Sequence, residues 1–587
     1  MKQFLITVLG VLIGMILFLV VAPIFVVSML SSSMGSAPAQ PNSIVVALDL
    51  REDMSDQPVG GGPALFGANP SLLETLAKID AAADDDRVRG LYIRANTAGM
   101  PPAHAEELRA ALAAFRASGK FVISHLQNDS VRMSLAGYYA ASAADEVWLQ
   151  ETGEVMPMGI AAEVDFFGAT LERFRVQAEV EAREEFKTFA NIFTEDGFTP
   201  AHREETTGLL NSLFDVMVAG IGENRNLTPD AVRAAIAATP FTAARAIELR
   251  LVDQLGRPED AERAALTRAG GDAEIVDMAM YSARSEGRGP VIAVVQGEGE
   301  IVSGLPDDSP FASTVMNSDS VARAILDAAE DEDVRAIVFR VSSPGGSVVA
   351  SDQILHAIRT AQEAGKRVVV SMGPVAASGG YYVSASADEI VANRTTITGS
   401  IGVVGAKITF GPALDHYFSV RTETVEVGSE LSDWFSPARP FSQAERAAFA
   451  GMIDRMYTSF VGLVAEGRDL TPEQAREVAK GRVWTGEQAL ERRLVDHIGG
   501  FMVAVDRAKA LAGIEADQQV QLRFFPEQLT PVQELQRFLG ASGQTAEAGA
   551  RLNAALSDPR IARALDAIAR DEDESAAQAR TQDMLVR

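Results

Sequence analysis

The second half of this chain repeats the first, and this constrains the fold more than any other feature of the sequence. The segment AGYYAASAADEVWL matches GGYYVSASADEIVA, and ARAIELRLVDQLG matches EQALERRLVDHIG. Tyr138 aligns with Tyr381 and Asp253 with Asp496, in both cases 243 positions apart (381 − 138 and 496 − 253). One register over so long a stretch predicts two copies of a single structural unit.

Each copy has the pattern of an α/β unit. In the second copy, short apolar runs such as VIAVV, AIVFRV and RVVVSM alternate with amphipathic stretches such as SVARAILDAAE and SDQILHAIRTAQEAG. Apolar strands that alternate with helices at this spacing are typical of βαβ units. We therefore expect an α/β core that occurs twice.

The N-terminus carries a long apolar run. Residues 4–30 contain no charged side chain, and a helix of that length exceeds the roughly 30 Å hydrocarbon core of a bilayer. The run is also longer than the roughly 7 to 15 apolar residues of a cleavable signal peptide. Lys2 precedes it, whereas Asp49 and Arg51 follow well after it. We predict an uncleaved transmembrane helix with its N-terminus in the cytoplasm and the rest of the chain outside.

These observations divide the chain into four parts. Residues 1–35 form the predicted membrane anchor, 36–285 the first repeat and 286–525 the second repeat. Residues 526–587 read as a helical, highly charged tail in which no chemistry is visible.

Composition excludes several classes of function. The 80 acidic residues exceed the 52 basic ones, and the net charge of −28 argues against a nucleic-acid partner. The chain has no cysteine, and its six histidines form no HExxH-like pair. We therefore expect neither a metal site nor a cofactor.

Two glycine-rich segments of the second copy could carry chemistry. In VSSPGGSVVASDQI a strand runs through Gly345 into a helix, a turn whose backbone amides can face an anion. In VVVSMGPVAASGGYYV, Ser378 precedes Gly379 at the start of a helix, as a nucleophile does on a strand-to-helix elbow. The plainer interpretations are a tight turn and a serine that caps a helix.

Together with TTITGSIGVVG, these segments resemble the signal peptide peptidase A family over almost the whole chain. The resemblance includes the anchor and the tandem repeat of the family's long form, and it implies crotonase-like or ClpP-like α/β units. It also implies that Ser378 is the nucleophile, that Gly345 and Gly379 supply oxyanion amides, and that Ser400 orients the base.

The repeat register points to that base. The position 243 residues before Ser378 is Leu135, so the first copy lacks the nucleophile. One-domain relatives carry a lysine base where this chain has Glu430, so the second copy lacks the base. The repeat partner of Glu430 is Lys187 (430 − 243), which matches the catalytic lysine of the long family members.

Composition supports Lys187 as the base. Only eight of the 52 basic residues are lysine, and a buried lysine can lose its proton near neutral pH, whereas arginine cannot. Lys407, soon after the TGS motif, is the alternative base. His356 would be the base of a Ser-His-Asp triad, but it lies at the boundary of an amphipathic helix, where a surface histidine is the plainer interpretation.

The sequence therefore predicts a serine endopeptidase whose site combines Lys187 and Ser378 from the two repeats. The resemblance implies that it degrades signal peptides in the periplasm, at the bacterial inner membrane, as a homotetrameric ring. The sequence leaves open whether the dyad forms within one chain or between chains. Other possibilities are an inactive scaffold and an enzyme similar to acyl-CoA hydratases or isomerases.

Overall fold

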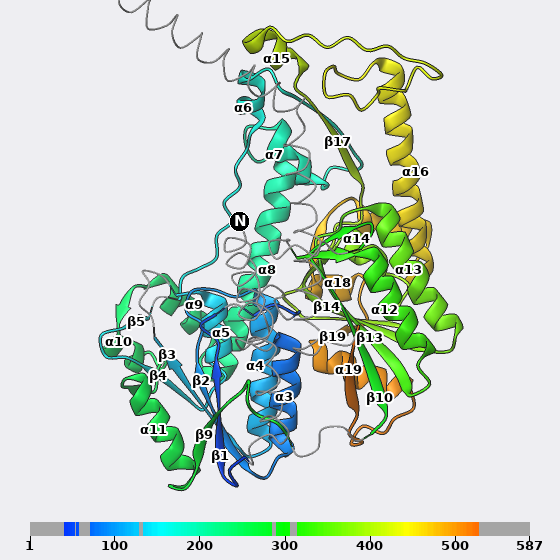
Figure 1. The fold of residues 1–587 in the computed structure, drawn as a ribbon. Coiled ribbons are helices and arrows are strands. Elements are labelled where there is room, and N and C mark those ends of the chain that lie inside the picture. Colours follow the sequence, from blue (N-terminus) through cyan, green and yellow to red (C-terminus); the bar gives the residue numbers. More distant parts are fainter. Residues whose placement is uncertain are drawn as a thin grey trace, which may run out of the picture.

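The computed structural model describes residues 40–52, 54–57, 71–127, 133–155, 157–283, 289–305 and 314–526 (Figure 1). The predicted anchor (residues 1–35) lies outside these ranges, as does the predicted tail beyond residue 526. Among the helices of the described ranges, none is both long enough and apolar enough to cross a membrane.

The first repeat is built around a six-stranded sheet in which every neighbouring pair is parallel. The strand order is β8-β4-β3-β2-β1-β9. These strands are β1 (Ile44–Asp49), β2 (Val88–Arg94), β3 (Phe121–Leu126), β4 (Glu146–Leu149), β8 (Gln254–Leu255) and β9 (Glu274–Asp277).

The second repeat contains an eight-stranded sheet, which is parallel except where β18 pairs with β16. Its main path runs β18-β16-β14-β13-β10-β20, and β15 and β19 extend it beside β14. The strands are β10 (Val291–Glu298), β13 (Val334–Ser343), β14 (Arg367–Ala377), β15 (Glu389–Ala392), β16 (Ile397–Gly399), β18 (Val483–Thr485), β19 (His497–Ile498) and β20 (Gln521–Phe525). Parallel strands linked by helices confirm the predicted α/β class.

The duplication extends to individual hydrogen bonds. The hydroxyl of Tyr138 donates to the carbonyl of Leu251 at 2.7 Å, and that of Tyr381 donates to the carbonyl of Leu494 at 2.9 Å. Both members of the second pair lie 243 positions after those of the first (381 − 138 and 494 − 251). The same offset relates the ion pairs Arg225–Asp253 and Arg468–Asp496.

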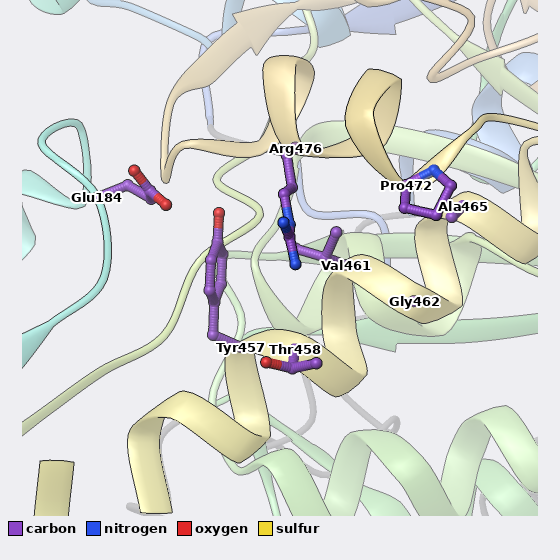
Figure 2. Close-up of a pocket in the computed structure, with 8 residues that line it drawn as sticks. All are labelled: Glu184, Tyr457, Thr458, Val461, Gly462, Ala465, Pro472 and Arg476. Atoms are coloured by element: carbon purple, nitrogen blue, oxygen red, sulfur yellow. The ribbon is translucent and has the colours of Figure 1, made fainter. Parts of the chain in front are cut away.

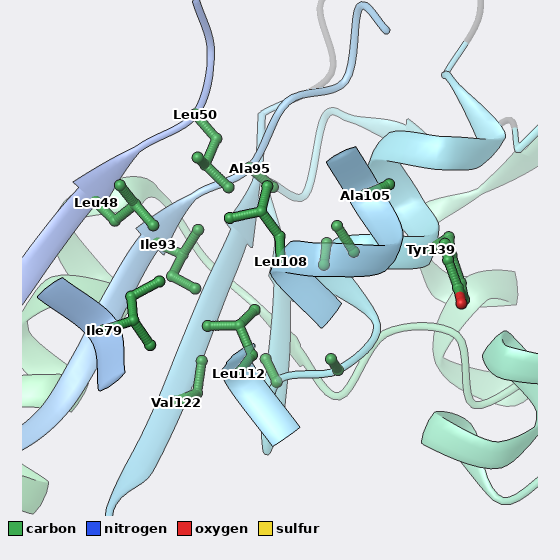
Figure 3. Close-up of a cluster of buried hydrophobic side chains, with 14 of the residues drawn as sticks. Leu48, Leu50, Ile79, Ile93, Ala95, Ala105, Leu108, Leu112, Val122 and Tyr139 are labelled. Atoms are coloured by element: carbon green, nitrogen blue, oxygen red, sulfur yellow. The ribbon is translucent and has the colours of Figure 1, made fainter. Parts of the chain in front are cut away.

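Helices of the first repeat fill the space between the two sheets (Figure 1). α3 (Leu72–Asp84) and α4 (Pro102–Ala117) bury Ile79, Leu108 and Leu112 against the first sheet, as Figure 3 shows. On their other side, α4 packs against β14 and α3 against α19 (Phe501–Leu511). One hydrophobic core therefore joins the two repeats, and its burial fixes how they sit against each other.

The outer faces are covered by other helices. α11 (Pro258–Ala269) covers the outer face of the first sheet, whereas α12 (Ser318–Glu330) and α13 (Val348–Glu363) cover that of the second. The remaining helices on or beside the sheets are α5 (Leu135–Ala141), α8 (Pro200–Arg225), α9 (Pro229–Ala237), α10 (Ala243–Glu248), α14 (Gly379–Ser384), α17 (Pro472–Ala479) and α18 (Gly486–Glu491). Two short pairs complete this part: β5 (Glu154–Val155) with β7 (Phe241–Thr242), and β11 (Glu300–Val302) with β12 (Val315–Asn317).

Both repeats contribute to an extension at the top of Figure 1. Its centre is an antiparallel ribbon of β6 (Gln177–Ala182) from the first repeat and β17 (Val404–Thr409) from the second. The ribbon is flanked by α6 (Gly168–Arg173), α15 (Gly411–Phe418) and α16 (Gln443–Gly467), and the 3-10 helix η3 (Thr188–Ala190) and α7 (Asn191–Thr194) follow β6. This pairing brings a segment of the first repeat beside the end of β14.

Candidate active site

Ser378 stands on a sharp turn between β14 and α14. Its backbone has φ 53° and ψ −116°, which is rare for a residue with a side chain. Its amide donates to the Gly399 carbonyl at 2.9 Å, and its carbonyl accepts from the Tyr382 amide at 2.8 Å, so both sides of the turn are held. The side chain does not cap the helix, which rules out the capping serine. The strained backbone instead presents the hydroxyl for other contacts.

Lys187 reaches this hydroxyl from the other repeat. It follows β6 and precedes η3, and its Nζ lies 3.2 Å from Ser378 Oγ. The same Nζ donates to the carbonyl of Ser400 and to Ser400 Oγ, both at 2.9 Å. Within one chain, the structure thus brings together the three residues that the sequence predicted for the nucleophile, the base and the orienting group.

Burial sets the electrostatics of this lysine. The Lys187 side chain is almost fully buried, at 8% exposed, and this desolvation lowers the pKa of its ammonium to about 8. The Glu205 carboxylate acts in the opposite direction and favours the charged form. A substantial fraction of Lys187 is therefore neutral in mildly alkaline solution and can accept a proton.

The backbone around Lys187 is held by a turn of the second repeat. The Phe186 amide donates to the Lys480 carbonyl at 3.2 Å. Gly481 follows with φ +74°, and a Cβ at that glycine would lie 2.6 Å from the Lys187 amide nitrogen. The close approach of these two segments requires a glycine at position 481.

The PGG turn lies against Ser378. A Cβ on Gly345 would lie 2.7 Å from the Gly379 amide nitrogen and 2.8 Å from Ser378 Cβ. The Gly345 amide itself donates to Ser343 Oγ at 3.1 Å. Gly346 is exposed, and its amide nitrogen lies 3.2 Å from where a Cβ on Gly379 would be. The Gly346 amide is thus a second candidate donor to an oxyanion. The sequence did not predict it, because a PGG motif does not show which of its amides already donates a hydrogen bond within the protein.

The alternative bases occupy other places. Lys407 is buried in the ribbon, where its Nζ donates to the Trp434 carbonyl at 2.7 Å and lies 4.3 Å from the centroid of the Phe441 ring. His356 is exposed on α13, and Glu430 is exposed in the loop between α15 and α16. Among the side-chain hydrogen bonds of the described residues, only that of Lys187 reaches the Ser378 hydroxyl.

The first repeat has an ordinary helix start where the second repeat has the strained turn. Leu135, the partner of Ser378, begins α5 and is buried. Ser134 precedes it and caps this helix through the Gly137 amide at 3.3 Å. Within the described residues, His, Asp and Glu side chains nowhere gather in threes that could hold a metal ion.

A pocket of about 300 Å³ opens beside the loop that leads to Lys187. Figure 2 shows Glu184 across from Tyr457 and Arg476, between α16 and α17. None of the predicted site residues lines it. The dyad therefore lies outside this pocket, at the junction of the two repeats.

Comparisons with known proteins agree with the repeat and show the family. The family model "Peptidase family S49" matches residues 114–270 and again 360–515. Protease 4 of Salmonella typhi is 33% identical over 475 residues, which cover 77% of this chain and 75% of that protein. The chloroplastic serine protease SPPA of Arabidopsis thaliana is 26% identical over 510 residues, or 85% and 73% of the two chains. Among solved structures, a mutant of the 1510-N membrane-bound stomatin-specific protease matches with 14% identity over 40% of this chain and 98% of that chain, at a TM-score of 0.25.

Proposed function

The chain belongs to peptidase family S49 and is a serine peptidase, and we propose that it cleaves peptides with a dyad of Ser378 and Lys187. The observation that carries this proposal is the 3.2 Å approach of Lys187 Nζ to Ser378 Oγ across the junction of the repeats. The finer fold assignment, two crotonase-like or ClpP-like units, stays a prediction.

The hydrogen bonds around Lys187 suit a base. A neutral amine has two hydrogens, and the carbonyl and hydroxyl of Ser400 offer two acceptors for them. The lone pair is then free to accept the proton of Ser378 Oγ. The alkoxide attacks the peptide carbonyl, and the Lys187 ammonium returns its proton to the leaving amine. Water, deprotonated by the same lysine, then attacks the acyl group, and the Lys187 ammonium gives its proton to Ser378 Oγ as the acyl–oxygen bond breaks.

The oxyanion of the tetrahedral intermediate needs donors close to Ser378. We assign this role to the Gly379 amide and to the PGG turn, where Gly345 is the predicted donor and Gly346 the exposed one. If Gly345 contributes, its amide must leave Ser343 Oγ. Removing one such donor in other hydrolases lowers kcat by roughly 100-fold to 1000-fold.

The proposed substrates are cleaved signal peptides and other apolar peptides. A curated relative in Enterococcus faecium is named "Putative signal peptide peptidase SppA" and is 31% identical over 209 residues. The apolar run of residues 4–30 supports an anchor in the bacterial inner membrane, with the catalytic repeats in the periplasm. There the enzyme would meet apolar peptides as they leave the bilayer.

Peptide hydrolysis by three variants tests the dyad. Wild type should hydrolyse an apolar fluorogenic peptide, whereas Ser378→Ala and Lys187→Arg should be inactive while their unfolding temperatures stay unchanged. Lys407→Arg is the matched control and should keep activity, because the Lys407 ammonium donates to the Trp434 carbonyl and lies over the Phe441 ring, contacts that an arginine can also make. Activity retained by Lys187→Arg, or lost in Lys407→Arg, would place the base elsewhere.

We also propose that the chain forms a homotetrameric ring, and the repeat symmetry supports this. In the first sheet, Arg94 lies opposite His125 on the neighbouring strand, and in the second sheet Arg340 lies opposite Ser371. Arg340 and Ser371 each lie 246 positions after the corresponding residue of the first sheet (340 − 94 and 371 − 125). Arg340 is fully buried under the first repeat. At the corresponding outer face of the first sheet, by contrast, Arg94 Nε and His125 Nδ1 are buried without a hydrogen-bond partner.

The same outer face is hollowed. A cavity of about 490 Å³ is lined by Ile123 and Trp148 together with residues of α11. Equivalent strand pairing in the two sheets relates Ile123 to Val369 and Trp148 to Val391. Val369 and Val391 both belong to the hydrophobic core that joins the repeats. We infer that this face receives α12 and α13 of a neighbouring chain, since these helices correspond to α3 and α4. Head-to-tail contacts of this kind form a ring when the rotation between neighbouring chains closes.

Light scattering tests this assembly. Thr267 is exposed on α11 at the rim of the cavity, so Thr267→Arg should leave the fold intact and lower the particle mass in detergent. A wild type that is monomeric, or a variant that assembles as wild type does, would contradict the proposed interface.

A further inference from the structure

Glu205 is a buried carboxylate for which the proposed reaction has no role so far. It lies on α8 of the first repeat and is 6% exposed. Its Oε2 accepts a hydrogen bond from Thr188 Oγ1 at 3.1 Å, and its Oε1 accepts one from the Val483 amide at 2.7 Å. The carboxylate therefore ties η3 of the first repeat to β18 of the second.

Both partners adjoin the dyad. Thr188 is the next residue after Lys187. Val483 pairs with Gly399 across the β16–β18 ladder, and the neighbouring Arg482 carbonyl accepts from the Ser400 amide at 2.7 Å. Through these contacts Glu205 connects the backbone that carries the base to the backbone that carries its orienting serine.

We propose that Glu205 is a positioning residue for Lys187, which fixes the base against Ser400 and sets the pH range in which the peptidase works. This inference rests on the proposed role of Lys187 as the base. Glu205 makes no contact with the reacting hydroxyl and acts only through its neighbours.

The charges around Glu205 support the second part of this role. Burial raises the pKa of the Glu205 carboxyl, whereas the Val483 amide, the Thr188 hydroxyl, Arg482 and Lys187 all favour its ionised form. The ionised carboxylate in turn raises the pKa of Lys187, against the larger effect of burial. Loss of this one charge should therefore move the titration of the base to lower pH.

The adjacent residue provides a matched control. Glu204 lies one position earlier on α8, and its carboxylate pairs with Arg482 at 2.9 Å. Its side chain is 62% exposed, so solvent screens its charge. A Glu204→Gln variant removes the same charge from the same helix without touching Thr188 or Val483.

The test is the pH dependence of kcat/KM for peptide hydrolysis by the full-length enzyme and its variants. Glu205→Gln keeps an oxygen for the Val483 amide and removes the charge. We expect the acidic limb of its kcat/KM profile to move to lower pH. At a pH on that limb, kcat/KM divided by its plateau value should be about twofold or more higher than in wild type. The plateau should stay near that of wild type, and Glu204→Gln should keep the wild-type profile.

Glu205→Ala tests the positioning part, because it removes both hydrogen bonds. Its plateau kcat should fall about tenfold or more, since a misplaced base loses reactive geometry, and Glu205→Gln should restore it. An unchanged limb in Glu205→Gln, or a normal plateau in folded Glu205→Ala, would overturn the inference. A Lys187→Arg enzyme that remains active would instead refute the proposed base itself, whatever the Glu205 variants show.

Discussion

At the scale of single residues, the proposed catalytic pair is a lysine that is buried next to a strained serine. Desolvation lowers the pKa of Lys187, and the turn at Ser378 exposes a hydroxyl that an ordinary helix cap would engage. The resemblance to the signal peptide peptidase A family predicted this pair, and the register of the repeat related Glu430 of the second copy to Lys187 of the first. Glu205 and Gly346 were not predictable, because their roles depend on hydrogen bonds between segments far apart in the chain.

The pH profile of the wild-type enzyme follows from this lysine. Only neutral Lys187 accepts a proton, and its pKa is lowered to about 8. Activity should therefore rise with pH through an acidic limb centred near pH 8, as measured by kcat/KM on a neutral peptide. A limb centred near pH 6.5 would instead indicate a histidine base.

At the scale of elements, the site exists because segments of one repeat are held by segments of the other. The sequence predicted the strands and helices of each α/β unit, since their hydrophobic periodicity is strong. It did not predict the β6–β17 ribbon, which pairs strands more than 220 positions apart (404 − 182) and shows no local pattern. That ribbon delivers Lys187 to Ser378.

The turn at Gly481 tests this dependence on backbone contacts. Gly481→Ala places a methyl group 2.6 Å from the Lys187 amide nitrogen, so the base must shift. We expect kcat to fall about tenfold or more. Gly513→Ala is the control: it has a similar φ of +70° but open space around its Cβ, so it should cost only about 1 kcal/mol of stability and no activity. Equal losses of kcat in both variants would contradict this, because they would show that backbone strain from an alanine at positive φ explains the loss without any contact to Lys187.

At the scale of the whole molecule, the two repeats form one body through an apolar core and a buried ion cluster. Arg340 of β13 pairs with Asp56 at 2.9 Å and with Glu107 of α4 at 2.8 Å, and all three side chains are at most 1% exposed. The duplication predicted two units but not this junction, because nothing in an isolated arginine indicates that it will be buried. The cluster fixes the mutual position of the repeats and thereby the geometry of the dyad.

Removal of Arg340 should therefore destabilise the entire chain. Arg340→Met leaves Asp56 and Glu107 buried without their cation, which should lower the free energy of unfolding by about 3 to 5 kcal/mol. Arg367→Met on the adjacent strand is the control, since Arg367 is 56% exposed in its pair with Asp388 and should contribute at most about 1 kcal/mol. Denaturant unfolding measures the free energy of unfolding of both variants. Similar losses would contradict this prediction, because the buried cluster would then contribute no more stability than an exposed ion pair.

The two members of the proposed dyad come from different repeats of the same chain, and complementation tests this arrangement. Ser378→Ala and Lys187→Ala chains carrying different affinity tags are coexpressed, and the mixed oligomers are isolated through both tags. Each chain then lacks one member of its own pair, so we predict no peptide hydrolysis by the mixed oligomers, while wild-type chains isolated in the same way are active. Recovery of activity in the mixed oligomers would mean that Lys187 of one chain serves Ser378 of another, and would contradict this account.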